Sequence, residues 1–82
     1  MHPKNPIALL NIIIPLVESD AQSYAIYLGN LYYRFSSTYI AEQYGYKHRQ
    51  SVNKVVNMVA YKLTYDNKTK EDIDNLIKSL GL

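Results

Sequence analysis

Apolar residues recur every three or four positions along most of this chain, which is the pattern of helices that bury one face. The pattern is clear over 21–35, 49–63 and 69–80, and a shorter apolar run lies at 7–17. These stretches predict an all-α fold, a small helical bundle of four to five helices that contains a helix-turn-helix. A chain of 82 residues has room for one modest core, so we expect a single domain over 1–82.

The first 18 residues are expected to form an N-terminal helix. Asn5 can cap it, Pro6 suits its first turn, and Pro15 should end or kink it. The apolar run is about half the length of a membrane-spanning helix. Because Pro15 interrupts this run and acidic residues follow it without a clear cleavage site, we do not expect a secretion signal. We therefore expect a cytoplasmic protein without a membrane segment.

A second helix is predicted over 21–35. Ser19 and Gln22 have the spacing of a capping box, in which each side chain satisfies a free backbone donor of the other. Gly29 weakens the helix by roughly 1 kcal/mol relative to alanine. Either a close helix crossing requires this glycine, or it has no structural role.

The stretch 36–63 is predicted to be the helix-turn-helix. Ser36 or Ser37 can cap its first helix, and Gly45 fits the left-handed position that ends it. The second helix should run from about Arg49 to Leu63. Its expected inner face consists of Val52, Val55, Val56, Val59 and Leu63, and its expected outer face of Arg49, Gln50, Asn53 and Lys54, with Ser51 at the side.

The last predicted helix covers 69–80 and ends at Gly81. Thr69 and Asp72 resemble a capping box, with Asp72 where a glutamate is more usual. We place Glu71, Asp72 and Asp74 in the first turn, where carboxylates complement the helix dipole, and prefer this interpretation to a metal or acid–base role.

Positive charge is concentrated in the predicted turn and second motif helix. Residues 45–62 carry four Lys or Arg and no acid, whereas 1–44 and 63–82 each have a net charge of −1. The total of +2 is small for a nucleic-acid-binding protein, and ordinary scatter of surface charge would also produce it. The local excess nevertheless indicates a polyanionic partner.

Composition excludes several kinds of chemistry. The chain has no cysteine, which removes disulfides, thiolate metal sites and cysteine nucleophiles. Its two histidines, His2 and His48, lie on different segments, and no metal-ligand cluster or Ser, His and acid constellation is evident. We therefore expect neither an enzyme nor a metal or other cofactor. The nine tyrosines are expected at the edge of the core, with hydroxyls in water.

Two separated stretches resemble a known family. The first runs from Ile40 to Val52 and includes Tyr44-Gly45-Tyr46-Lys47-His48-Arg49-Gln50-Ser51-Val52. It is similar to the motif I-x-x-x-F-G-G-R-D-H-T-T-V of the C-terminal DNA-binding domain of the bacterial replication initiator DnaA, a helix-turn-helix of the Trp-repressor type. The second, from Lys70 to Leu80, resembles that family's K-E-D-F-x-N-L-I-R-x-L. The resemblance covers about 21–80, most of the chain.

The resemblance implies a double-stranded DNA-binding domain, a small regulator of replication or transcription associated with the nucleoid. It implies that bases are contacted in the major groove by His48, Arg49, Gln50 and Ser51. It implies contacts to the DNA backbone from Ser37 and Thr38 and a phosphate or base contact from Lys54, and our hypothesis adds Lys47 of the turn as a further phosphate contact. Arg, Gln and Ser are also good partners for base edges on chemical grounds.

The chain also departs from the family. Gln22, Ser23 and Asn30 stand where the family usually has phosphate-binding Arg, Gln and Lys, and Ile14 stands where an arginine enters the minor groove. His48 to Ser51 replace Asp-His-Thr-Thr, so the family's target sequence cannot be inherited, and no ATP-binding loop is present. An alternative hypothesis is therefore a protein-interaction module, or a homodimer formed through Ile7, Leu10, Ile13 and Ile14 of the N-terminal helix.

Overall fold

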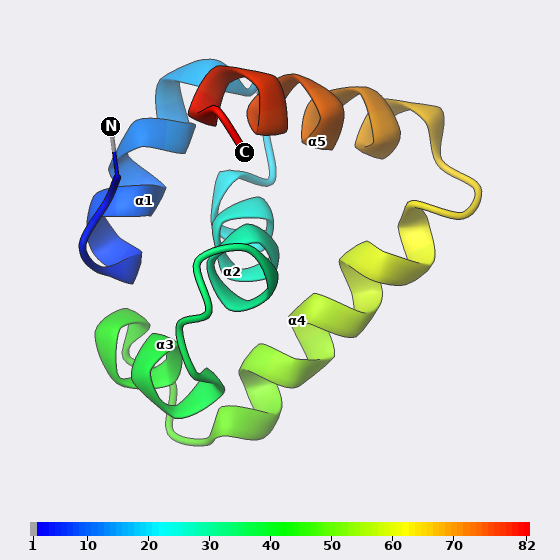
Figure 1. The fold of residues 1–82 in the computed structure, drawn as a ribbon. Coiled ribbons are helices and arrows are strands. Elements are labelled where there is room, and N and C mark those ends of the chain that lie inside the picture. The colour runs from blue at the N-terminus through cyan, green and yellow to red at the C-terminus, as the bar shows by residue number, and fades with distance from the viewer. Residues whose placement is uncertain (1) are drawn as a thin grey trace.

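Five α-helices and one short 3-10 helix form the fold of residues 2–82, the part of the chain that the computed structural model describes. In chain order they are α1 (Pro6–Ile13), the 3-10 helix η1 (Ile14–Leu16), α2 (Ala21–Leu31), α3 (Ser37–Tyr44), α4 (Arg49–Lys62) and α5 (Asn67–Leu80) (Figure 1). No strand occurs among these residues. The predicted all-α bundle is confirmed.

Helix α2 lies at the centre of the bundle, and α1, α3 and α4 pack against it (Figure 1). The core has two parts. The larger joins α1, α2, α4 and α5 through Leu9, Ile13, Tyr24, Ala25, Leu28, Val59, Ile73, Leu76 and Leu80. The smaller joins α2, α3 and α4 through Ile26, Ile40, Ala41 and Val52. Because complete burial of one Ile or Leu contributes about 1.5–3 kcal/mol, the small cluster is enough to orient α3 and α4 on α2.

The N-terminal segment contains the predicted helix in a shorter form. The Asn5 side chain accepts a hydrogen bond from the Ala8 N–H at 2.8 Å, and Pro6 occupies the first turn. Regular α-helix ends at Ile13, and Pro15 lies in η1, as expected of a residue that cannot donate a backbone hydrogen bond. Among residues 2–82, no helix combines the length and the apolar character needed to cross a membrane.

Helix α2 begins at Ala21, as predicted, but its cap and its end differ from the sequence prediction. Its cap residue is Asp20 in a left-handed conformation (φ 65°), and the Ser19–Gln22 capping box is wrong. The Gln22 amide instead donates to the Tyr46 hydroxyl at 2.9 Å. The helix stops at Leu31 rather than Phe35, because Arg34 turns the chain with φ 62° and the Phe35 N–H returns to the Gly29 carbonyl.

Gly29 sits at a close helix crossing, as one of the two sequence interpretations proposed. A Cβ atom there would lie 3.4 Å from the Leu9 side chain of α1 and 3.2 Å from the Phe35 ring. Glycine thus lets α1 approach the α2 backbone closely. The packing gained in this way compensates for the low helix propensity of glycine.

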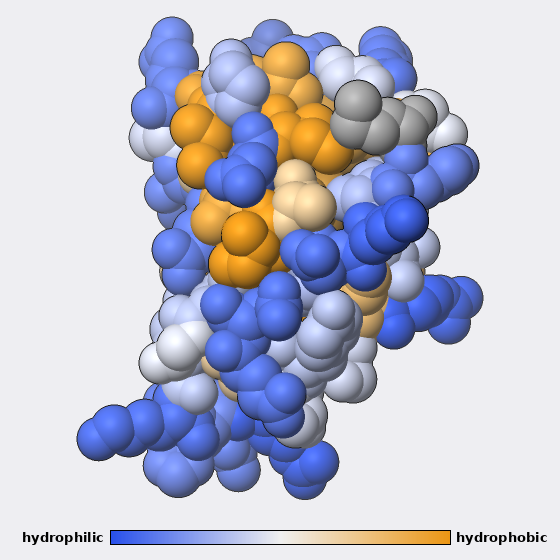
Figure 2. Space-filling view, turned by 90° about the vertical axis from the view of Figure 1, so that its left-hand side faces the viewer, coloured by the Kyte–Doolittle hydropathy of each residue, from blue (hydrophilic) through white to orange (hydrophobic). Residues whose placement is uncertain are grey.

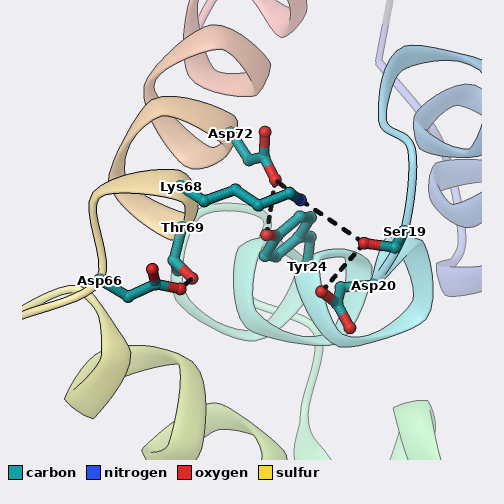
Figure 3. A network of polar contacts seen from close by, with 7 residues as sticks. All are labelled: Ser19, Asp20, Tyr24, Asp66, Lys68, Thr69 and Asp72. Carbon is teal, nitrogen blue, oxygen red and sulfur yellow. Dashed lines mark hydrogen bonds and ion pairs between the residues drawn. The ribbon is translucent and has the colours of Figure 1, made fainter.

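Helix α5 begins two residues earlier than predicted, at Asn67. Thr69 lies inside it, buried, and donates to the Asp66 carboxylate at 2.6 Å, so the Thr69–Asp72 capping box is wrong (Figure 3). This hydrogen bond is the main reason that the pKa of Asp66 lies below its usual value. Glu71, Asp72 and Asp74 consequently fall after the first turn, and their predicted role at the helix dipole is also wrong.

Candidate nucleic-acid interface

Helices α3 and α4 are joined by a four-residue turn, 45–48. The Ser36 hydroxyl accepts from the Tyr39 N–H at 3.1 Å, which selects Ser36 over Ser37 as the cap of α3. Gly45 adopts the predicted left-handed conformation (φ 77°), and the Tyr46 N–H closes the turn on the Ala41 carbonyl at 2.9 Å. The bounds 49–62 of α4 agree with the predicted helix to within one residue.

Burial on one face of α4 fixes which side chains face outward. Val52 and Val59 are fully buried, and Val55, Val56 and Leu63 are half-buried, so the predicted inner face is confirmed. Val52 packs in the small cluster with α3, and Val59 packs in the large cluster. The two valines lie seven residues apart, or about two helical turns, so they anchor both halves of the helix.

The predicted site residues lie in the turn, in the first turns of α4 and at the start of α3, which the bond between Ser37 and Asn53 brings beside α4. Six of them are exposed, namely Thr38, Lys47, His48, Arg49, Gln50 and Lys54, and two are half-buried, namely Ser37 and Ser51. His48 is the extended residue immediately before α4, and within the described residues its side chain makes no capping hydrogen bond. The Ser51 N–H donates to the His48 carbonyl at 3.1 Å, so within residues 2–82 the N–H groups of Arg49 and Gln50 are the ones that remain donors for an anion.

A hydrogen bond connects the two helices across this surface. The Ser37 hydroxyl donates to Oδ1 of Asn53 at 2.6 Å, which places the start of α3 beside the outer face of α4. Because the amide oxygen of Asn53 accepts this bond, its NH₂ group is available to another partner. The sequence placed Asn53 on the outer face but did not identify this link. No local pattern reveals a hydrogen bond between residues 16 positions apart.

The turn is held by two tyrosines. The Tyr44 hydroxyl donates to the Pro6 carbonyl at 2.7 Å, and the Tyr46 hydroxyl accepts from Gln22. Burial raises the pKa of Tyr44, so this hydroxyl keeps its proton. Gln22 thus supports the turn from α2.

The charges of this surface have few partners within the protein. From α3 to the end of α4 there are four positive residues, Lys47, Arg49, Lys54 and Lys62, and one negative residue, Glu42, a net charge of +3. Within residues 2–82 the one ion pair joins Lys68 and Asp72 of α5. The cations of the turn and of α4 can therefore bind an external anion without first breaking an internal ion pair.

The arrangement offers hydrogen-bond donors and positive charge on an exposed surface. In the described part of the chain, no three His, Asp or Glu side chains are grouped to hold a metal ion, and no pocket is present. Comparison of the chain with protein-family models, with curated proteins and with solved structures gives no match.

Proposed function

We propose that this protein is a double-stranded DNA-binding domain that inserts α4 into the major groove. The observation that carries the proposal is the exposed row of Arg49, Gln50 and Lys54, which forms no ion pair within residues 2–82 and adjoins the start of α3. An α-helix fits the major groove, and exposed cations at its start are attracted to the phosphates that flank it.

Base recognition is assigned to the N-terminal turn of α4. Arg49 can form two parallel hydrogen bonds with guanine, and Gln50 can do so with adenine. His48 and Ser51 flank them and complete the set of base contacts. Only this end of α4 lies beside α3, so docking there lets both helices approach the same stretch of duplex.

Phosphate contacts are assigned to the residues around this centre. Ser37 and Thr38 lie at the start of α3, where the Thr38 hydroxyl and the backbone N–H groups of both residues suit a phosphate oxygen, while the Ser37 hydroxyl donates to Asn53. Lys47 lies in the turn and Lys54 one turn beyond Gln50 on α4. These contacts fix the position of the domain on DNA without selecting a sequence.

In this proposal the domain acts by binding, without catalysis and without a metal or small-molecule cofactor. It serves as a small regulator of replication or transcription in the cytoplasm, at the nucleoid. The resemblance to the DnaA C-terminal domain supports this role, since His48 to Ser51 occupy the base-contacting positions of that motif.

Selection from random duplexes tests the proposal directly. We expect the purified protein to enrich a short common sequence, and a mobility-shift titration to show tighter binding to that sequence than to a scrambled duplex. A matched control is Lys70→Ala and Lys78→Ala, which removes two exposed cations from α5 and should leave binding unchanged. Absence of duplex binding by the wild-type protein at low salt would overturn the proposal.

A further inference from the structure

Exposed apolar side chains and exposed polar side chains lie on different parts of the molecule. Figure 2 shows hydrophobic residues gathered over α1 and η1, where Ile7 and Ile14 are 38% and 51% exposed. Ile13 is completely buried, so it belongs to the core and cannot form a seam with another molecule, contrary to the sequence expectation. The lower part of the same view, toward α3, is hydrophilic. A polar ligand therefore fits the side of α3 and α4 better than the side of α1.

Asn53 is an exposed residue of α4 to which the DNA contacts proposed above give no role. It lies four positions after Arg49 and three after Gln50, so the three side chains are neighbours on one face of the helix. The adjacent Val52 is completely buried in the small cluster with α2 and α3, which turns Asn53 outward. Where Arg49 and Gln50 reach base edges, Asn53 lies one helical turn farther along the same groove.

The start of α3 holds the Asn53 side chain in one orientation. The hydroxyl of Ser37, the first residue of α3, donates to Oδ1 of Asn53 at 2.6 Å. The oxygen and the nitrogen of a planar amide lie on opposite sides of the Cβ–Cγ bond, so the NH₂ group is directed away from Ser37. Because the oxygen already accepts a bond within the protein, Asn53 offers a ligand mainly its two N–H donors.

This orientation changes which base the asparagine can select. A free asparagine pairs best with adenine, because its oxygen accepts from N6 while its nitrogen donates to N7. With the oxygen bonded to Ser37, the NH₂ group is the part that meets the base. It suits an acceptor, such as O6 or N7 of guanine or O4 of thymine, and it is unsuited to the N4 donor of cytosine.

We propose that Asn53 is a further base-contacting residue and that Ser37 is a positioning residue, which directs the Asn53 amide toward a base that presents an acceptor. The inference rests on the proposed insertion of α4 into the major groove and adds a determinant of specificity to it. The Ser37 hydroxyl then acts within the protein, while the backbone N–H of the same residue stays available to a phosphate. One hydrogen bond between α3 and α4 thus selects the kind of base that is bound.

Selection from random duplexes with the whole protein tests the role of Asn53. The wild type should enrich guanine or thymine at one position of the common sequence. Asn53→Asp keeps an oxygen that can accept from Ser37 but replaces the donor with a second acceptor, so the preference at that position should move to cytosine. Asn53→Ala should remove the preference there and weaken binding to the selected duplex about fivefold.

The matched control is Asn57→Ala. Asn57 is an exposed asparagine one turn farther along α4, and its removal should change neither the preference nor the affinity. Circular dichroism establishes that each variant is folded.

Ser37→Ala tests the positioning role separately. Loss of the hydroxyl frees Oδ1 of Asn53, so the preference at the same position should move toward adenine. Ser37→Thr keeps a hydroxyl and should retain the wild-type preference. If the Ser37 hydroxyl contacted only a phosphate, its removal would weaken binding to every sequence equally. That result, with an unchanged preference, would refute the positioning role.

The two proposals fail in different ways. If the wild type enriches a common sequence and Asn53→Ala retains the preference at every position, the role of Asn53 is wrong and DNA binding by α4 stands. If the wild type binds no duplex at low salt, both proposals are wrong.

Discussion

The α3–α4 surface and the contact between α2 and α5 both carry many polar side chains, but within residues 2–82 an ion pair forms only in the second region. The Tyr24 hydroxyl of α2 donates to the Asp72 carboxylate at 2.7 Å, and Lys68 approaches the same oxygen at 3.0 Å (Figure 3). On the α3–α4 surface, Ser37 and Asn53 bond to each other, while Arg49 and Lys54 have no ion-pair partner among residues 2–82.

This difference separates polar groups that stabilise the fold from groups that are available for binding. Tyr24 is 2% exposed, so its hydroxyl would lose hydrogen bonds on folding if Asp72 did not accept one. Exposed Arg49 and Lys54 are solvated before and after folding and contribute little to stability. Removal of the Arg49 side chain should therefore have little effect on the free energy of unfolding, whereas removal of the Asp72 carboxylate should lower it. Substitutions can thus change binding and stability separately.

The largest expected effect is that of Arg49→Ala on DNA binding. Loss of two hydrogen bonds to one base should reduce affinity for the selected sequence by about 10- to 100-fold and relax the preference at that position. Fluorescence anisotropy with the selected and scrambled duplexes measures both effects.

The thermal unfolding midpoint of Arg49→Ala should match that of the wild type, because the side chain is exposed. Lys70→Ala provides the control, since it removes an exposed cation from α5 and should alter neither quantity. Unchanged sequence preference in Arg49→Ala would contradict the assignment of Arg49 to a base.

Asp72→Ala should lower stability and leave DNA binding unchanged, which is the opposite of the result expected for Arg49→Ala. Removal of the carboxylate leaves the buried Tyr24 hydroxyl without an acceptor, which should lower the free energy of unfolding by about 2 kcal/mol. Chemical denaturation measures this loss. Affinity for DNA should be unchanged under conditions in which the variant is fully folded.

Asp74→Ala is the matched control for that change. Asp74 is an exposed carboxylate on the same helix, two residues away, and its removal should alter stability by less than about 0.5 kcal/mol. Equal losses in both variants would show that helix charge, rather than the bond to Tyr24, is responsible.

A smaller change in the free energy of unfolding is expected at alkaline pH, because of Tyr24. Burial, followed by the hydrogen bond and the negative charge of Asp72, raises the pKa of Tyr24 above its usual value of 10.0. Folding therefore favours the protonated hydroxyl: its stabilising contribution is complete below pH 10 and is lost as pH rises from there toward the folded-state pKa. Between pH 10 and 11 the loss should be about 1 kcal/mol.

Chemical denaturation of Tyr24→Phe over the same pH range isolates this contribution. The variant should lose less stability than the wild type between pH 10 and 11, whereas Tyr61→Phe, at an exposed position of α4, should follow the wild type. A pH dependence that is the same in all three proteins would rule out Tyr24 as its source.

Local sequence patterns correctly predicted those structural features that neighbouring residues determine. Asn5 and Pro6 start α1, Gly45 ends α3, and the valines of α4 face the core. The exposure of most candidate site residues followed from the same periodicity. In each case the determining contact lies within a few positions or on one helical face.

The sequence predictions were wrong where a distant contact or an irregular backbone conformation took the place of an expected local contact. Gln22 had capping-box spacing but bonds to Tyr46, 24 positions away. Arg34 ends the turn after α2 in a left-handed conformation that the sequence does not signal, because glycine and asparagine are the residues that favour it. The Thr69 hydroxyl donates to the Asp66 carboxylate, three residues earlier, and α5 begins at Asn67 and not at Thr69. The Ser37–Asn53 link was missed for the same reason.

The smallest effect, and the sharpest distinction within the α3–α4 surface, is expected from Lys54→Ala. A lysine that contacts a phosphate adds affinity for every sequence equally, so the variant should bind selected and scrambled duplexes about threefold more weakly and retain its preference. The slope of log affinity against log salt should fall in magnitude by about 0.9, because one fewer counterion is released. Anisotropy titrations over a series of salt concentrations measure the slope, with Lys78→Ala on α5 as the control that should keep the wild-type value. A changed preference at one base position would instead place Lys54 among the base-contacting residues, beside Arg49 and Gln50.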